Sequence, residues 1–155
     1  MNLTWIEVVD SIVKIGLGSI ITAVFGYLVM KSNQKNQDIK EKKDRFYKVQ
    51  DEKAEIYVKF LSQSHQLVQT YLSTCCKCNT EEYFTYLNTY SKVQIFSSDE
   101  IRKGAFSVFN AVNVFIVFNK NLDNNLTIEM RDNVNSSIAY FQFIAHQETT
   151  KKFNV

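Results

Sequence analysis

The chain has 155 residues, of which 45% are hydrophobic and 14% aromatic, and its net charge at pH 7 is +2. It contains no proline and only four glycines, so it lacks the turn residues that a β-sandwich or barrel requires. The apolar content excludes an intrinsically disordered chain, and the small net charge creates no basic field that would attract nucleic acid. These values favour an all-helical protein with one domain and an additional segment.

Apolar and charged residues are distributed unevenly along the chain. Apolar residues dominate 5–30, charged residues dominate 31–55, and apolar residues recur at helical spacing in 56–150. We therefore expect a tail and transmembrane anchor in residues 1–30, a charged helical stalk in 31–55, a helical bundle in 56–150 and a short tail in 151–155.

The expected anchor is the segment from Ile12 to Met30, which carries a single charge, Lys14. As a helix it would be about 29 Å long, which is close to the thickness of the hydrocarbon core of a membrane. The cluster of basic residues that precedes the apolar part of a cleaved signal peptide is missing here. We expect this segment to span a membrane, and a buried helix of a soluble protein is the alternative.

Basic residues follow the apolar segment but are almost absent before it. Lys31 and Lys35 come shortly after Met30, and more basic residues follow within 40–48. Because flanking basic residues stay in the cytoplasm, we expect the N-terminus outside a bacterial inner membrane and the bundle inside. Lys31 and Lys35 are also placed to contact anionic lipid headgroups.

Small residues recur every fourth position within the apolar segment, at Gly18, Thr22 and Gly26. Such a row lets two helices approach closely, and close packing drives helix association in lipid. We expect these residues to mediate self-association, although glycine is also common in membrane helices that do not associate.

The charged segment consists of good helix formers, and opposite charges lie at helical spacing, as in Glu41 and Arg45. A weak seven-residue apolar repeat, interrupted by Lys53, consists of Ile39, Phe46, Phe60 and Leu67. Too few positions are apolar to define a coiled coil, so a continuous helix leaving the membrane is the prediction.

Four helical patterns can be traced in the bundle region. The first continues the stalk and is expected to end near Cys78. A second helix is expected after the cap pair Asn79 and Glu82, and a third at the capping box formed by Ser97 and Glu100. Short loops between such helices favour antiparallel neighbours, so the prediction is an antiparallel four-helix bundle.

The fourth helix is expected from about Leu126 or Thr127 to Gln147, after an asparagine-rich loop at 119–125. The expected core stripe of the third helix is Ile101, Ala105, Val108, Val112 and Phe115. That of the fourth helix is Met130, Val134, Ile138, Phe141 and Ala145.

The third helix is unusually aromatic and carries no charge from Gly104 to Asn119. Deep burial or contact with another subunit explains this pattern better than a second membrane span. Polar side chains that would be costly in hydrocarbon are Ser107, Asn110 and Asn113. The residues expected to form an interaction surface are Phe109, Phe115 and Phe118.

Cys75, Cys76 and Cys78 are the only cysteines. Their spacing lacks the separated pairs of a zinc site, so ordinary cytosolic cysteines are expected, with thiol redox sensing as an alternative. The sequence shows no phosphate-binding glycine loop, no paired-histidine metal motif and no nucleophile elbow. We expect neither an enzyme nor a cofactor, metal site or small-molecule substrate.

The expected function is therefore that of a single-pass membrane-anchored scaffold, adaptor or sensor whose cytoplasmic bundle binds a protein partner or a second copy. The expected partners are membrane lipid and protein, without nucleic acid. The alternative is a membrane-perturbing effector, of a holin-like or abortive-infection kind, that acts through oligomerised transmembrane helices.

Overall fold

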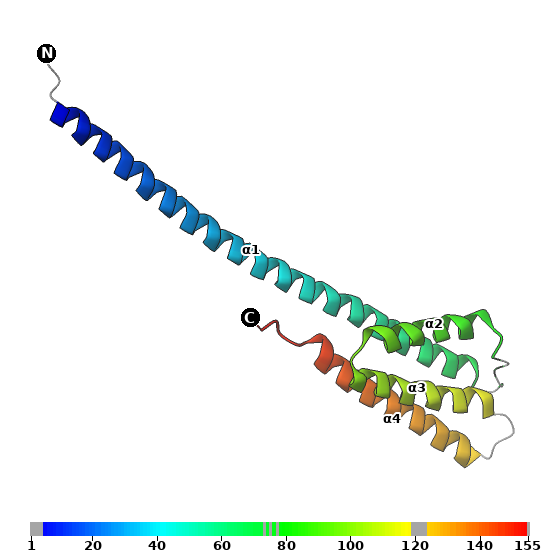
Figure 1. Cartoon of the computed structure of the whole chain (residues 1–155). Helices are drawn as coiled ribbons and strands as arrows, with labels where there is room; N and C mark the ends of the chain where they lie inside the picture. Colours follow the sequence, from blue (N-terminus) through cyan, green and yellow to red (C-terminus); the bar gives the residue numbers. More distant parts are fainter. Residues whose placement is uncertain (1–4, 73, 75, 77, 119–123, 155) are drawn as a thin grey trace. The chain divides into compact units, whose positions relative to one another are not determined.

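The computed structural model describes residues 5–72, 74, 76, 78–118 and 124–154, and for residues 6–21 and 124 it describes the backbone alone. The described residues form four helices and no strands (Figure 1). The helices are α1 (Trp5–Thr70), α2 (Glu81–Phe96), α3 (Asp99–Phe118) and α4 (Asn124–Thr149). The prediction of an all-helical chain is confirmed.

The chain divides into two compact units, of which the first ends at Arg45 and the second is Phe46–Asn154. The described part of the first unit is a single helical segment, and the second contains the end of α1 together with α2, α3 and α4. The division falls inside the segment 31–55 that the sequence marks as highly charged.

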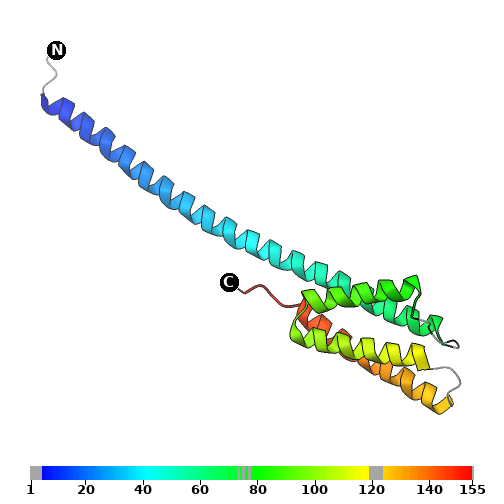
Figure 2. The ribbon, with the colours of Figure 1, turned by 45° about the vertical axis from the view of Figure 1, so that its right-hand side comes forward.

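The second unit is a helical bundle around one hydrophobic core, and α2, α3 and α4 lie side by side with the end of α1 in both ribbon views (Figures 1 and 2). Each helix contributes an aromatic ring with no exposed surface: Phe60, Tyr86, Phe115 and Phe141. Burial of each such side chain stabilises the fold by about 1.5–3 kcal/mol.

Contacts between α1 and α2 pair residues in opposite order along the chain. The Tyr57 hydroxyl donates a hydrogen bond to Ser97 Oγ at 2.8 Å, and Ser64 Oγ donates to the Tyr86 hydroxyl at 3.3 Å. The Phe60 and Tyr86 rings stack at 5.4 Å between these two bonds. These two helices therefore run in opposite directions.

Small residues bring α3 and α4 close together, also in opposite directions. The Ser107 and Ser137 hydroxyls lie 3.2 Å apart. A Cβ at Gly104 would overlap the Cδ1 atom of Ile144, so only glycine leaves room for the present position of that side chain. The interface thus depends on residues that add little bulk between the helix axes.

The core stripes predicted for α3 and α4 are confirmed, except that Met130 is only half-buried. Two helix ends differ from the predictions. The first helix ends at Thr70 instead of near Cys78, and α2 is capped by Thr80, whose hydroxyl accepts the Tyr83 N–H, instead of by Asn79.

The capping box predicted at the start of α3 is also wrong. Ser97 is extended, with φ −109° and ψ 164°, and its hydroxyl accepts the hydrogen bond from Tyr57. The helix begins at Asp99, where two acidic residues favour its N-terminus. Most of the asparagine-rich loop predicted at 119–125 lies outside the described residues.

Candidate functional site

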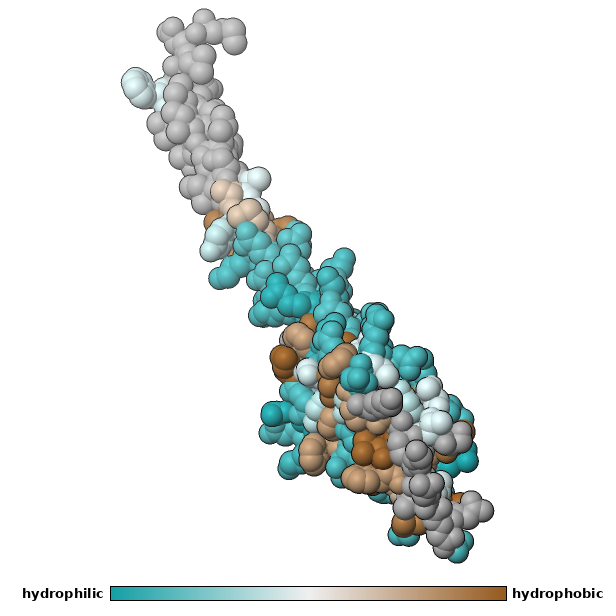
Figure 3. Space-filling view, turned by 90° about the vertical axis from the view of Figure 1, so that its right-hand side faces the viewer, coloured by the Kyte–Doolittle hydropathy of each residue, from teal (hydrophilic) through white to brown (hydrophobic). Residues whose placement is uncertain are grey.

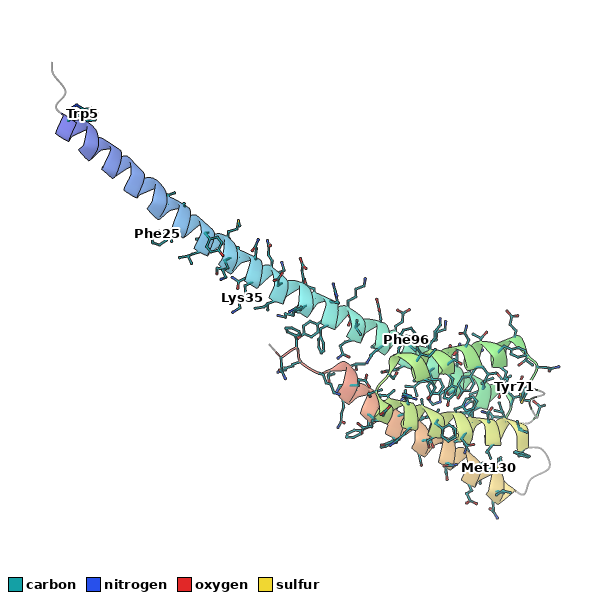
Figure 4. All side chains as sticks on the ribbon, in the orientation of Figure 1. Trp5, Phe25, Lys35, Tyr71, Phe96 and Met130 are labelled. Carbon is teal, nitrogen blue, oxygen red and sulfur yellow. The ribbon has the colours of Figure 1, made fainter. Side chains whose placement is uncertain are left out.

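The first unit exposes apolar side chains all around α1. Between 52 and 64% of each of the following side chains is exposed: Val24, Phe25, Tyr27, Leu28, Val29 and Met30. Figure 4 shows Phe25 projecting from the helix. A helix that is apolar on every side is normally buried in a large core or in lipid. No other described residue of the first unit covers these side chains.

The small-residue row predicted for helix packing is only partly described. Gly18 lies in the stretch for which the backbone alone is described, and it is helical there. Thr22 and Gly26 are exposed, and a Cβ at Gly26 would meet no atom within 4 Å. The surface beside Gly26 is therefore open to lipid or to another helix.

The apolar stretch of α1 ends abruptly in a hydrophilic one. Lys31 and Lys35, both predicted to contact lipid headgroups, are exposed on α1. Figure 4 shows the position of Lys35. Figure 3 shows the change from brown apolar residues to teal hydrophilic residues along this segment. Exposed lysines at such a border can reach headgroup phosphates while the apolar residues remain in hydrocarbon.

Among the side chains that the structure describes, one helix, α3, is long and apolar enough to cross a membrane, with a mean hydropathy of 1.3. A core helix of a soluble protein meets the same criterion, and 44% of this segment is buried inside the bundle. Lys103 and Asn110 lie exposed on the side of the helix away from this core. This distribution is that of an amphipathic helix facing a protein core.

The three phenylalanines predicted to form an interaction surface occupy different environments. Phe115 has no exposed surface and belongs to the core, so it is not part of an exposed surface in this structure. Phe109 is half-buried, and its ring stacks on that of Tyr90 at 4.2 Å. Phe118 is 62% exposed and is the one member of the three that remains largely accessible.

A polar cluster links three parts of the bundle around the buried carboxylate of Glu148. Lys53 Nζ on α1 donates to Glu148 Oε1 at 2.5 Å, and Ser98 Oγ, between α2 and α3, donates to Oε2 at 2.6 Å. Burial alone would raise the pKa of Glu148. The hydrogen bonds from Lys53 and Ser98, together with the positive charges of Lys53 and Lys151, lower it overall below its usual value.

Tyr57 and Gln50 lie on α1 on either side of Lys53. Burial raises the pKa of Tyr57 to about 12, assisted by the negative charge of Glu148 and opposed by the hydrogen bond to Ser97. Gln50 is 8% exposed, and its Oε1 has no hydrogen-bond partner. Each carboxylate oxygen of Glu148 accepts a hydrogen bond from a different part of the bundle, so the cluster fixes helix positions.

Sequence reasoning missed this cluster, although two signals for it exist. Lys53 interrupts the apolar repeat between Phe46 and Phe60, which places a charge on an inward-facing position. Glu148 follows Phe141 and Ala145 at helical spacing and therefore continues the core stripe of α4. Two opposite charges that both occupy core positions are expected to pair.

The cysteine region contains two described thiols. Cys76 is buried, and its N–H donates to the carbonyl oxygen of Ile116 at 2.7 Å. Cys78 has a positive φ of 55°, and its N–H donates to Cys76 Sγ at 3.2 Å. Burial and the neighbouring Cys76 raise the pKa of the Cys78 thiol. Cys75 lies outside the described residues, and the described part of the chain contains no group of three potential metal ligands.

Open hollows follow the contact between α1 and α2. One of these, of about 280 Å³, is lined by Glu52, Glu55, Ile56, Lys59, Thr89 and Lys92. A smaller one, of about 110 Å³, shares Glu52 and Ile56 and adds Val49, Lys53 and Phe96. Toward the cysteine region, a third of about 250 Å³ is bordered by Gln63, Glu81 and Glu82, among others. The surface of the α1–α2 contact thus contains several open hollows.

Comparison with models of known protein families, with curated proteins and with solved structures finds no match to this chain.

Proposed function

We propose that this chain is a single-pass protein of a bacterial inner membrane, anchored by residues 12–30, with its N-terminus outside and its helical bundle in the cytoplasm. In this proposal α1 is a transmembrane helix that continues through a charged stalk into an antiparallel four-helix bundle. The bundle serves as a scaffold, adaptor or sensor that binds a protein partner or a second copy of the chain.

The exposed apolar surface of α1 carries this proposal. Within residues 24–30, every position except Gly26 exposes an aliphatic or aromatic group, and the apolar pattern continues back to Ile12 in the sequence. Transfer of each such side chain from water to hydrocarbon is favourable by about 1.5–3 kcal/mol when burial is complete. Lipid is the environment that covers all sides of one helix simultaneously.

The charge asymmetry supports the proposed sidedness. Lys31 and Lys35 are exposed directly after the apolar stretch, whereas Lys14 is the one basic side chain before Met30. Insertion keeps such flanking basic residues in the cytoplasm. The bundle, which follows them in the chain, is therefore assigned to the cytoplasm.

Large apolar side chains on the bundle surface support a role in protein binding. Large apolar side chains with 59 to 73% of their surface exposed are Val58, Ile95, Phe96, Phe106, Phe118 and Phe143. Monomeric soluble proteins keep contiguous exposed apolar areas small, and larger ones mark interaction sites. Most of the buried polar side chains, by contrast, have hydrogen-bond partners within the bundle.

Charges placed in the apolar stretch test the anchor. In the full chain, Ile21→Asp combined with Phe25→Asp should move the protein from the alkali-washed membrane pellet to the supernatant. Each aspartate near the centre of a membrane helix costs about 3 kcal/mol of insertion free energy. The matched control is Gln34→Asp with Gln37→Asp, which adds the same charge in the hydrophilic stretch and should leave the protein in the pellet.

A wild-type chain that stays in the supernatant without detergent would refute the anchor. A reporter fused after Val155 that is active only outside the cytoplasm would refute the sidedness. Membrane potential recorded in the same cells separates the proposed role from the membrane-perturbing one, since a scaffold leaves the potential unchanged on induction.

A further inference from the structure

We infer that the bundle associates with a second copy of this chain through the face formed by α1 and α2. We call this the α1–α2 face and define it by Glu52, Glu55, Ile56, Lys59, Lys92 and Phe96. The inference deepens the proposed function and rests on it, because the shared membrane brings the copies together. The interaction surface predicted from the sequence was the aromatic third helix, whereas this inference places self-association on α1 and α2.

The charges on this face are balanced, and none of them forms an ion pair with another described residue. Glu52, Glu55 and Lys59 lie on α1, and Lys92 lies on α2, all around one hollow of about 280 Å³. Among the described residues, the ion pairs of the bundle are Lys53 with Glu148 and Arg102 with Asp99, so none of these four charges is paired. Two acids and two bases without internal partners form a self-complementary set.

An apolar centre accompanies these charges. Ile56 lines both hollows and packs against the core, and beside it Val49 and Phe96 line the smaller hollow. Phe96 lies at the end of α2 (Figure 4), with 59% of its surface exposed, and Val49 has 45% exposed. An exposed ring next to an unfilled hollow provides both a projection and a recess on one surface.

In a dimer with two-fold symmetry, each contact made by these residues occurs twice. In an isologous interface the same patch serves on both copies, so the patch must contain groups that complement each other. If α1 of one copy faces α2 of the other, Glu52 and Glu55 approach Lys92 of the second copy, and the reciprocal contacts form by symmetry. The Phe96 ring of each copy then meets the apolar hollow of the other.

Charge complementarity selects a second copy over an unrelated partner. A partner of one predominant charge would leave either the two acids or the two lysines facing like charge, which is unfavourable. A second copy provides both signs in equal number. Anchoring in one membrane raises the effective concentration of the bundles, so a face of modest area is sufficient for association.

Charge reversal tests the inference in the full membrane-inserted chain. The acid-reversed variant carries Glu52→Lys and Glu55→Lys, and the base-reversed variant carries Lys59→Glu and Lys92→Glu. Energy transfer between donor- and acceptor-labelled copies in lipid vesicles measures association, in a background with Gly18→Ile and Gly26→Ile that removes close packing within the membrane. Each variant alone should associate at least about ten-fold more weakly, because all four charges on its face then have one sign.

The decisive measurement combines the two sets of reversals, so that opposite charges again face each other across the interface. The chain with all four reversals, and an equimolar mixture of the acid-reversed and base-reversed chains, should both associate within about three-fold of the unreversed chain. Phe96→Ser should weaken association, whereas the matched variant Phe143→Ser, which removes an equally exposed ring from α4, should not. Tyrosine circular dichroism of each variant verifies that the bundle is folded.

The inference is overturned if the single-sign variants associate like the unreversed chain, or if neither recombination restores association. The second result would show that the reversals act in some way other than by charge pairing between copies. Failure of the proposed anchor gives a different signal, because the chains would then be absent from the washed vesicles regardless of their charge pattern.

Discussion

The Lys53–Glu148 ion pair occupies core positions of α1 and α4 in a bundle whose interior is otherwise largely apolar. The side chain of Glu148 is 7% exposed and that of Lys53 is 22% exposed. Removing either partner leaves a buried or half-buried charge without its counter-charge, which costs more than the pair itself contributes. Since Ser98 also binds the carboxylate, the cluster sets the position of α4 relative to α1 and to the α2–α3 connection.

Glu148→Gln tests this role. The amide keeps the size of the side chain but removes its charge, so we expect the free energy of unfolding at pH 7 to fall by about 2 kcal/mol. Urea unfolding of the detergent-solubilised full chain, followed by the near-ultraviolet circular dichroism of the buried tyrosines, measures this change. Glu129→Gln, at an exposed site on the same helix, is the matched control and should have little effect.

The direction of the pKa shift of Glu148 determines how the difference in unfolding free energy between the wild type and Glu148→Gln depends on pH. The pKa of Glu148 is lowered in the folded state, so its stabilising contribution is fully present above its ordinary pKa of 4.5. The contribution is lost as the pH falls through the lowered folded-state pKa. The unfolding curves of the wild type and Glu148→Gln should therefore converge under acid. A gap that does not narrow at all as the pH falls below 4.5 would contradict this account.

At the scale of the helices, α3 and α4 form the tightest contact because Gly104 faces Ile144. Alanine at position 104 has opposing effects. It favours the helix by about 1 kcal/mol relative to glycine, but its Cβ overlaps Ile144 Cδ1 in a packed interior. Truncation of Ile144 to valine removes the atom that is overlapped.

We expect the sign of the alanine effect to reverse between two backgrounds. Gly104→Ala should lower the free energy of unfolding by about 1 kcal/mol in the wild type, and raise it by up to about 1 kcal/mol in the Ile144→Val chain. The same urea experiment on the four chains gives the coupling between the two sites. Additive effects would show that the Ile144 side chain rotates away without cost.

The helical core was predictable from sequence where periodicity is strong. Val108 and Phe115 on α3, and Val134 and Phe141 on α4, follow the 3.6-residue repeat and are buried. Helix ends were less predictable because polar side chains there have competing partners. Ser97, expected to cap α3, accepts a hydrogen bond from Tyr57, which lies 40 residues earlier in the chain. Sequence spacing contains no information about such a distant donor.

The exposure of the three phenylalanines predicted to form an interaction surface was not predictable for a related reason. Phe109, Phe115 and Phe118 differ in exposure because their positions around α3 differ: Phe115 faces the core, Phe109 faces α2 and Phe118 faces outward. Aromatic content alone does not distinguish these directions. The unpaired charges of the α1–α2 face could not be predicted from the sequence either, since opposite charges near one another in sequence normally indicate a solvated helix surface.

At the scale of the whole chain, α1 passes through three environments. Its apolar stretch up to Met30 has lipid as its proposed cover, residues 31–45 are almost wholly exposed, and residues 46–70 contribute to the bundle core. Isolated helices in water are stabilised only by intrinsic propensity and weak charge pairs, so they open readily. The middle stretch should therefore be the least stable part of α1, although its backbone is helical throughout.

Amide hydrogen exchange of the full chain in lipid vesicles tests this ordering. We expect slow exchange at residues 16–30, where water is excluded, and again at residues 57–68, where opening requires unfolding of the core. Residues 32–44 should exchange at least about 100-fold faster than residues 57–68, because their opening exposes no buried surface. The Ile21→Asp, Phe25→Asp chain serves as the control, since loss of the lipid cover should accelerate exchange at residues 16–30 and leave residues 57–68 unchanged. Uniform slow exchange along all of α1 would contradict this account and would indicate that another polypeptide covers the charged stretch.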